Sequence, residues 1–164
     1  MHIVDDDADF RDGLAWLLDS RGLRTRCWAG GDQFLADLRP GSDTWACGIM
    51  LLDIRMEPLS GLATFEQLKA QGWPWPILFL TGHGDLSMAV AAVKNGAWDF
   101  LEKPFQDNQR VDKVEAACRE AIVLQTESQA KLRFQQALAA LSQREREVLD
   151  ELLQGHYNKN IADH

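Results

Sequence analysis

Short apolar runs alternate with segments of helical periodicity along the first part of the chain. Five runs are expected to form strands, and several are apolar throughout, as strands buried on both faces of a sheet are: residues 2–5, 24–28, 47–53, 76–81 and 98–102. Between them, apolar residues recur at helical spacing: Phe10, Leu14, Leu17 and Leu18; Phe34, Leu35 and Leu38; Leu62, Phe65 and Leu68; Met88, Val90, Ala91 and Val93. This alternation predicts an α/β fold with a parallel sheet covered by helices.

The pattern changes after residue 107. No proline or glycine occurs between Asp107 and Leu141, and the segment opens with an apolar stripe of Val111, Val114, Cys118 and Ile122. A helix of roughly 34 residues here would be about 50 Å long. The stripe lapses in the polar stretch 125–131, which favours an extended final helix that becomes a linker over a coiled-coil seam.

Another helix is predicted close to the end of the sequence. Ser142 and Glu145 have the spacing of a capping box, and they precede the apolar residues Val148, Leu149, Leu152 and Leu153. Gly155 is expected to end that helix, and Asn158 is expected to cap the next one.

The composition indicates a globular chain with an acidic first part. Of the 164 residues, 46% are apolar, which is enough for a buried core. Residues 1–107 carry 9 Lys and Arg against 16 Asp and Glu, so most of the net charge of -8 lies there. An acidic domain of this kind is a poor ligand for nucleic acid and a better one for a cation.

The sequence favours a cytoplasmic protein with no membrane partner. No apolar run approaches the ~20 residues that a membrane span needs, and the start lacks the features of a signal peptide. Cys27, Cys47 and Cys118 are odd in number and lack CxxC spacing, which favours reduced packing residues over a disulfide or a zinc site.

Polar residues stand at the carboxyl ends of several predicted strands. Asp5 and Asp6 end the first run, Asp53 the third and Thr81 the fourth, and Lys103 follows the fifth. Each residue alone has an ordinary structural explanation, such as a helix cap or a solvated charge. In a parallel sheet, however, these ends converge on one crevice where the strand order reverses. Three adjacent carboxylates repel one another unless a cation neutralises them, and hard oxygen ligands favour Mg²⁺.

The motifs around these residues resemble those of a known family. DD (5–6), DIRMEPLSG (53–61), TGHGD (81–85) and EKPF (102–105) are similar in order and interval to the signature of CheY-like receiver domains of bacterial response regulators. The resemblance covers residues 2 to about 120 and points to the NarL/FixJ type. It implies a flavodoxin-like, doubly wound sheet of five parallel strands in the order 2-1-3-4-5.

The resemblance also implies a role for each residue of the crevice. Asp53 is the expected phosphoacceptor. The expected ligands of Mg²⁺ are Asp5, Asp6, Asp53 and the carbonyl oxygen of Arg55. The residues expected to contact the phosphoryl group are Thr81, Gly82 and Lys103. One departure from the family is Glu57, which stands where proline is common, with proline following at Pro58.

Two further features follow from the resemblance. Thr81 and Phe100 are the expected switch residues, because Thr81 is expected to move toward the phosphoryl group while Phe100 turns inward. This change is expected to remodel a face that forms a homodimer on phosphorylation and includes Met88, Val90, Lys94 and Trp98.

Residues 142–164 resemble the opening of a LuxR-type helix-turn-helix domain. In that family a recognition helix comes after this point and enters the major groove, so the DNA-binding residues stay unknown from the sequence given. The expected parts are therefore a receiver domain at 1–120, a helical linker at 121–141 and an incomplete all-α helix-turn-helix domain at 142–164.

A phosphorylation-switched transcription regulator is the expected function. The receiver would accept a phosphoryl group from a sensor histidine kinase, dimerise, and act on promoter DNA if its C-terminal domain is complete. The alternative is a receiver that acts through protein contacts alone. A Mg²⁺-dependent phosphotransferase acting on a small molecule is disfavoured, since the sequence offers no separate general acid or substrate lid. The expected chemistry is limited to self-phosphorylation and dephosphorylation at Asp53.

Overall fold

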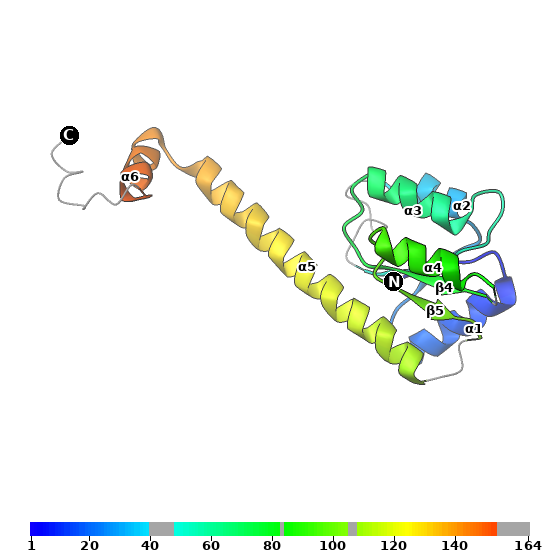
Figure 1. Ribbon diagram of the computed structural model, residues 1–164. Coiled ribbons are helices and arrows are strands. Elements are labelled where there is room, and N and C mark those ends of the chain that lie inside the picture. The colour runs from blue at the N-terminus through cyan, green and yellow to red at the C-terminus, as the bar shows by residue number, and fades with distance from the viewer. Residues whose placement is uncertain (40–47, 83, 105–107, 154–164) are drawn as a thin grey trace. The chain divides into compact units, whose positions relative to one another are not determined.

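A five-stranded parallel sheet forms the centre of the first part of the chain (Figure 1). The computed structural model describes residues 1–39, 48–82, 84–104 and 108–153. The strands are β1 (His2–Val4), β2 (Arg26–Trp28), β3 (Met50–Asp53), β4 (Ile77–Thr81) and β5 (Asp99–Glu102). They pair in parallel in the order β2-β1-β3-β4-β5, which confirms the predicted fold class and strand order.

The helices of the described residues alternate with these strands and then continue beyond them. They are α1 (Ala8–Asp19), α2 (Gly31–Asp37), α3 (Gly61–Ala70), α4 (Leu86–Lys94), α5 (Asn108–Ala140) and α6 (Gln143–Leu153). Asp7 caps α1 by accepting a hydrogen bond from Phe10 N at 3.1 Å, and Ser60 caps α3 by accepting one from Ala63 N at 3.3 Å. Both caps fix the backbone close to the carboxyl ends of β1 and β3.

Two apolar cores lie on opposite faces of the sheet. Alternate residues of β3 divide between them, since Met50 and Leu52 belong to one core and Leu51 to the other. Helices α2, α3 and α4 cover the first face, and α1 and α5 cover the second (Figure 1). The central strands β1, β3 and β4 are therefore buried on both faces, as their apolar runs predicted, whereas the edge strand β2 is largely exposed.

The buried face of α4 differs from the predicted one. Ala89 and Ala92 are buried, whereas Val90 is 39% exposed and Ala91 is exposed. Small side chains let this helix lie close to the sheet, so the largest apolar residues do not mark its buried face. The stripe predicted from Met88, Val90, Ala91 and Val93 is thus wrong at Val90 and Ala91.

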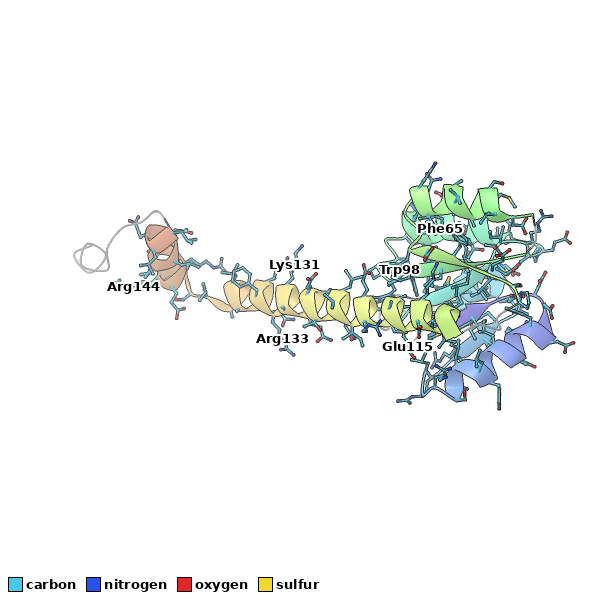
Figure 2. All side chains as sticks on the ribbon, turned by 60° about the horizontal axis from the view of Figure 1, so that its bottom comes forward. Phe65, Trp98, Glu115, Lys131, Arg133 and Arg144 are labelled. Atoms are coloured by element: carbon cyan, nitrogen blue, oxygen red, sulfur yellow. The ribbon has the colours of Figure 1, made fainter. Side chains whose placement is uncertain are left out.

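Helix α5 is 33 residues long, which confirms the predicted long final helix. Its first part packs on the second core through Val114, Ala117 and Ala121, and Val111 is buried as well; the predicted stripe is wrong at Ile122, which is 59% exposed. From residue 126 to residue 140 its side chains are exposed, among them Lys131 and Arg133 (Figure 2). The chain divides into two compact units within this helix, Met1–Leu124 and Gln125–His164.

The predicted capping box is present at the start of α6. Ser142 N donates to Glu145 Oε2 at 2.8 Å, and Glu145 N donates to Ser142 Oγ at 3.4 Å. The predicted helix stop at Gly155 and the cap at Asn158 lie outside the described residues.

The cysteines are only partly as predicted. Cys27 and Cys118 are reduced thiols, but Cys27 is exposed on the edge strand β2, so the prediction of a packing residue is wrong there. Cys47 lies outside the described residues. Within the described ranges, no helix is both long enough and apolar enough to cross a bilayer.

Candidate functional site

Lys103 connects the carboxyl ends of β1 and β3. Its Nζ lies 2.6 Å from Asp5 Oδ2 and 2.7 Å from Asp53 Oδ1. Asp5 is fully buried and Asp53 is 6% exposed, so both ion pairs are shielded from solvent. Lys103 itself follows β5. The structure therefore brings together residues from three strand ends that sequence reasoning assigned to one crevice.

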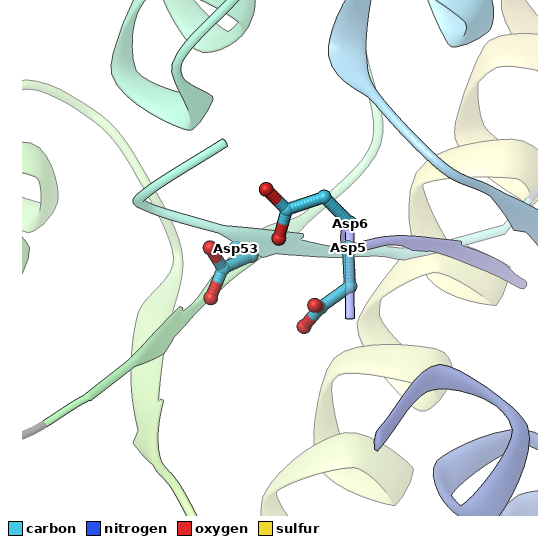
Figure 3. Close-up of side chains that lie close together, drawn as sticks. All are labelled: Asp5, Asp6 and Asp53. Carbon is cyan, nitrogen blue, oxygen red and sulfur yellow. The ribbon is translucent and has the colours of Figure 1, made fainter. Parts of the chain in front are cut away.

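Three carboxylates lie side by side at this edge of the sheet (Figure 3). Asp5, Asp6 and Asp53 each offer one oxygen, and these oxygens lie within 4.8 Å of one another. Asp6 is exposed while the other two are buried. Two carboxylates of the cluster are thus buried, and the third is accessible to solvent.

Backbone groups hold the two buried carboxylates in place. Asp7 N donates to Asp5 Oδ1 at 3.0 Å, and Arg55 N donates to Asp53 Oδ2 at 2.8 Å. The Arg11 side chain donates to the carbonyl oxygen of Asp5 at 2.6 Å. Each buried carboxylate therefore has one oxygen on a backbone N–H and the other on Lys103.

Burial and nearby negative charge raise the pKa of the two buried carboxyl groups, Asp5 and Asp53. Burial raises the pKa of Asp53 to about 6; the Lys103 hydrogen bond acts against this rise, and the charge of Asp5 adds to it. Burial also raises the pKa of Asp5 above its usual value. Burial alone would lower the pKa of Lys103, but its hydrogen bonds to Asp5 and Asp53 raise it overall. The site therefore gains from additional positive charge.

A divalent hard cation fits this donor set. Asp5 Oδ2 is buried, and the partner that the described residues offer it is the Lys103 ammonium at 2.6 Å. Carboxylate oxygens beside solvent-accessible space are the ligands that Mg²⁺ takes in proteins, where it keeps several waters. The residues present therefore suit Mg²⁺.

Thr81 and Gly82 lie at the end of β4, and the adjacent strand β3 ends at the Asp53 carboxylate. The Thr81 hydroxyl is buried, and Oγ1 has no hydrogen-bond partner within the described part of the chain. A methyl group added at Gly82 would meet its nearest neighbour, Asp85 Oδ2, only at 3.8 Å, so the backbone there leaves room. A buried, unpaired hydroxyl is unfavourable and is available to an acceptor that enters the site.

The residues expected on the switch and the dimer face lie on α4, on β5 and just before it. Phe100 is half-buried against the first core, and Lys113 Nζ lies 5.6 Å from its ring centroid. Trp98 is half-buried, and its Nε1 donates a hydrogen bond to Glu120 Oε2 at 2.7 Å (Figure 2). Met88 is half-buried, and Val90 and Lys94 are exposed.

Sequence reasoning missed several residues of the site. The Phe10 ring lies 4.3 Å from Lys103 Nζ, an aromatic contact for the ammonium. A side chain at Gly61 would overlap the carbonyl oxygen of Asp53, so only glycine fits where α3 begins. Gly61 ends the motif DIRMEPLSG, which was the available signal. Asp85, which pairs with Arg55, is a third such residue.

Comparison with known proteins identifies the family. The protein-family model described as response regulator receiver domain matches residues 1–115 of this chain. The chain belongs to the response regulators. A second model, described as bacterial regulatory proteins of the luxR family, matches residues 139–164. This response regulator thus has a receiver domain followed by a LuxR-type DNA-binding region, as predicted.

Its relatives are similar over almost the whole chain. It is 41% identical to the transcriptional regulatory protein FixJ of Bradyrhizobium diazoefficiens, over 99% of this chain and 77% of the relative. It is 44% identical to the C4-dicarboxylate transport transcriptional regulatory protein DctR of Rhodobacter capsulatus, over 99% of this chain and 82% of the relative.

Solved structures agree with this assignment. The response regulator StyR matches with a TM-score of 0.86 at 35% identity, over 99% of this chain and 80% of StyR. Full-length FixJ from B. japonicum matches with a TM-score of 0.68 at 41% identity, over 99% of this chain and 78% of FixJ. Membership of this family implies a histidine kinase partner and DNA binding.

Proposed function

We propose that Asp53 is the phosphoacceptor of this response regulator. The observation that carries the proposal is the bridge from Lys103 to both Asp5 and Asp53 at the ends of parallel strands. Asp53 ends a fully buried strand, and Arg55 N and Lys103 hold its two oxygens. A carboxylate fixed in this way can attack phosphorus along one direction without losing further freedom.

Mg²⁺ is the cofactor of this proposal. Its ligands are Asp5, Asp6 and Asp53, whose oxygens lie within 4.8 Å of one another, together with the carbonyl oxygen of Arg55. When bound, the ion neutralises negative charge on the carboxylates and on the incoming phosphoryl oxygens. The raised pKa of Asp53, about 6, and that of Asp5 support a site that needs a cation.

The phosphoryl group comes from a phosphohistidine of a sensor histidine kinase. An Asp53 oxygen forms a bond to phosphorus while the phosphorus–nitrogen bond breaks, and the imidazole leaves with the bonding electrons and takes up a proton. Lys103 donates to the phosphoryl oxygens, the Thr81 hydroxyl gains the acceptor it lacks, and Gly82 leaves space. Hydrolysis of the acyl phosphate returns the carboxylate.

Phosphorylation controls a homodimer in this proposal. Thr81 moves toward the phosphoryl group, Phe100 turns inward, and the face with Met88, Val90, Lys94 and Trp98 changes shape. The exposure of Val90 and Lys94 beside half-buried Met88 suits a transient interface with mixed polarity.

The output is transcription regulation at promoter DNA. The LuxR-type match at residues 139–164 supports it, as do relatives named transcriptional regulatory proteins. The receiver then spans 1–120, the helical linker 121–141, and the helix-turn-helix region begins at 142.

Intact-mass measurement tests the acceptor. With Mg²⁺ and phosphoramidate, whose phosphorus–nitrogen bond resembles that of phosphohistidine, the chain should gain one phosphoryl group. Asp53→Asn should gain none, while Asp12→Asn, a control at an exposed acidic residue of α1, should gain one. Equal labelling of Asp53→Asn and the wild type would place the acceptor elsewhere.

Light scattering tests the dimer. Beryllofluoride on the Asp53 carboxylate stands in for the phosphoryl group, with fluorines at the places of oxygens. The mimic should raise the mean mass toward that of a dimer, and Lys94→Glu should weaken the shift because it alters the charge of the proposed face. A mass that does not change with mimic over a wide concentration range contradicts this part of the proposal.

A further inference from the structure

An ion pair joins the loop after β3 to the start of α4. Arg55 Nε donates to Asp85 Oδ1 at 2.7 Å, and Arg55 Nη2 lies 2.5 Å from the same oxygen. The Asp85 side chain is 5% exposed, whereas that of Arg55 is 70% exposed. The carboxylate is therefore fixed in the protein, while the guanidinium can move through solvent.

Asp85 occupies the N-cap position of α4 but does not cap it. Its side chain makes no capping hydrogen bond to α4 within the described structure. Aspartate at this position commonly accepts hydrogen bonds from the first free N–H groups of the helix. The Asp85 carboxylate thus has two alternative partners, the Arg55 guanidinium and the N-terminus of α4.

Arg55 also lies next to the acceptor. Its backbone N–H donates to Asp53 Oδ2 at 2.8 Å. The hydrogen bond and charge of Asp85 raise the pKa of Arg55, and the charge of Asp53 adds to the rise. Both carboxylates therefore interact electrostatically with the guanidinium. Added negative charge at Asp53 acts on Arg55 directly.

A phosphoryl group at Asp53 would compete with Asp85 for this guanidinium. It adds about -1.5 to -2 charges and three acceptor oxygens. Arginine binds phosphate through two parallel hydrogen bonds, whereas in this structure both guanidinium contacts go to a single Asp85 oxygen. The phosphoryl group is therefore the stronger partner.

We infer that the Arg55–Asp85 ion pair is a latch of the unphosphorylated response regulator. Phosphorylation draws Arg55 away from Asp85, and the released carboxylate caps α4, which carries Met88, Val90 and Lys94. This route from acceptor to dimer face runs beside the one through Thr81 and needs no movement of its hydroxyl. The inference rests on the proposed phosphorylation of Asp53.

A double-mutant cycle measures the latch. Arg55→Ala, Asp85→Ala and the double variant are unfolded by denaturant in Mg²⁺, with and without beryllofluoride. Without the mimic, the two side chains should be coupled by about threefold or more in the unfolding equilibrium, as contacting residues usually are. With the mimic, the coupling should fall to about 1.5-fold or less. The exposed pair Glu66 and Lys69 on α3 is the control, and its coupling should not depend on the mimic.

The outcomes separate the two proposals. If the mimic does not stabilise the wild type against unfolding, the acceptor site is wrong and the latch falls with it. If the mimic stabilises the wild type but the Arg55–Asp85 coupling persists, only the latch is overturned. Asp85→Asn gives a second reading because it keeps a capping side chain but loses the charge. Asp85→Asn should raise the fraction of dimer in the absence of beryllofluoride. An unchanged fraction of dimer, together with an Arg55–Asp85 coupling that persists with beryllofluoride, contradicts the latch.

Discussion

Lys103 Nζ lies 2.7 Å from Asp53 Oδ1, within the shielded edge of the sheet. The same ammonium holds Asp5 Oδ2 at 2.6 Å, so removing it leaves two buried carboxylates without their common counter-charge. Lys103 is thus placed both to stabilise the resting site and to meet phosphoryl oxygens.

Replacing Lys103 should separate metal binding from phosphorylation. Lys103→Met keeps the length of the side chain and removes its charge. Labelling of the variant should slow by about 10- to 100-fold, because a hydrogen bond to a charged group is lost. Its affinity for Mg²⁺ should not fall, because the competing cation is gone. Rates from intact mass and a magnesium titration check both points, with Lys69→Met as the control. A variant that labels at the wild-type rate would contradict the role of Lys103.

Removing the Thr81 hydroxyl should stabilise the resting protein. Oγ1 is buried and has no hydrogen-bond partner among the described residues, and Thr81→Val replaces it with a methyl group of similar shape. Relief of an unsatisfied polar group should raise the free energy of unfolding by about 1 kcal/mol. The same variant should lose most of the dimer shift caused by beryllofluoride. Destabilisation by more than about 1 kcal/mol would show that the hydroxyl is already satisfied in the resting state.

The pKa of Asp53 predicts how stability depends on pH when Mg²⁺ is removed by chelation. Its value is about 6 in the folded protein against 3.8 for the reference group, so the folded state binds more protons between these values. Stability should therefore fall as pH rises through that window. At pH 7, Asp53→Asn should be more stable than the wild type by on the order of 1 kcal/mol after allowance for solvent screening. The difference should vanish near pH 4. Equal pH profiles for both proteins would rule out this assignment.

The pKa of His2 predicts the opposite dependence of stability on pH. His2 is buried between aromatic rings, with Trp28, Phe34 and Trp73 at centroid distances of 5.1, 5.4 and 5.9 Å. Burial lowers its pKa from 6.5 to about 3, so the unfolded state binds the proton first as pH falls. Stability from this residue is lost below pH 6.5, by on the order of 2 kcal/mol at pH 5. Denaturant unfolding of the wild type and of His2→Gln at pH 7 and pH 5 tests this prediction. Between pH 7 and pH 5, the free energy of unfolding should fall more for the wild type than for the variant.

The strand ends were predictable because topology alone brings them together. Apolar runs located β1, β3, β4 and β5, and parallel strands necessarily align their carboxyl ends. Asp5, Asp53 and Lys103 therefore meet whatever the details of packing are. The ion pair of Arg55 with Asp85 was not predictable, since it joins residues 30 positions apart and depends on the course of two loops.

Helix faces were less predictable than strand ends. Size suggested that Ile122 belongs to the buried face of α5, yet Ala117 and Ala121 occupy it. The depth at which a helix packs on a sheet decides between large and small residues, and that depth is a property of the assembled core. The aromatic surroundings of His2 were missed for a similar reason, because β1, β2 and α2 all contribute to them.

The two parts of helix α5 differ in stability although its backbone is continuous. Up to Ala121 it shares a core with the sheet, whereas residues 126–140 expose their side chains to solvent. An isolated helix of that length is marginal in water, because tertiary packing supplies most of the stability of helices. Amide hydrogens of the second to fourth turns of α5, which have intrahelical partners, should therefore exchange only when the receiver opens as a whole. Those beyond residue 126 should exchange through local fraying, many times faster, along a helix that has no break in its backbone.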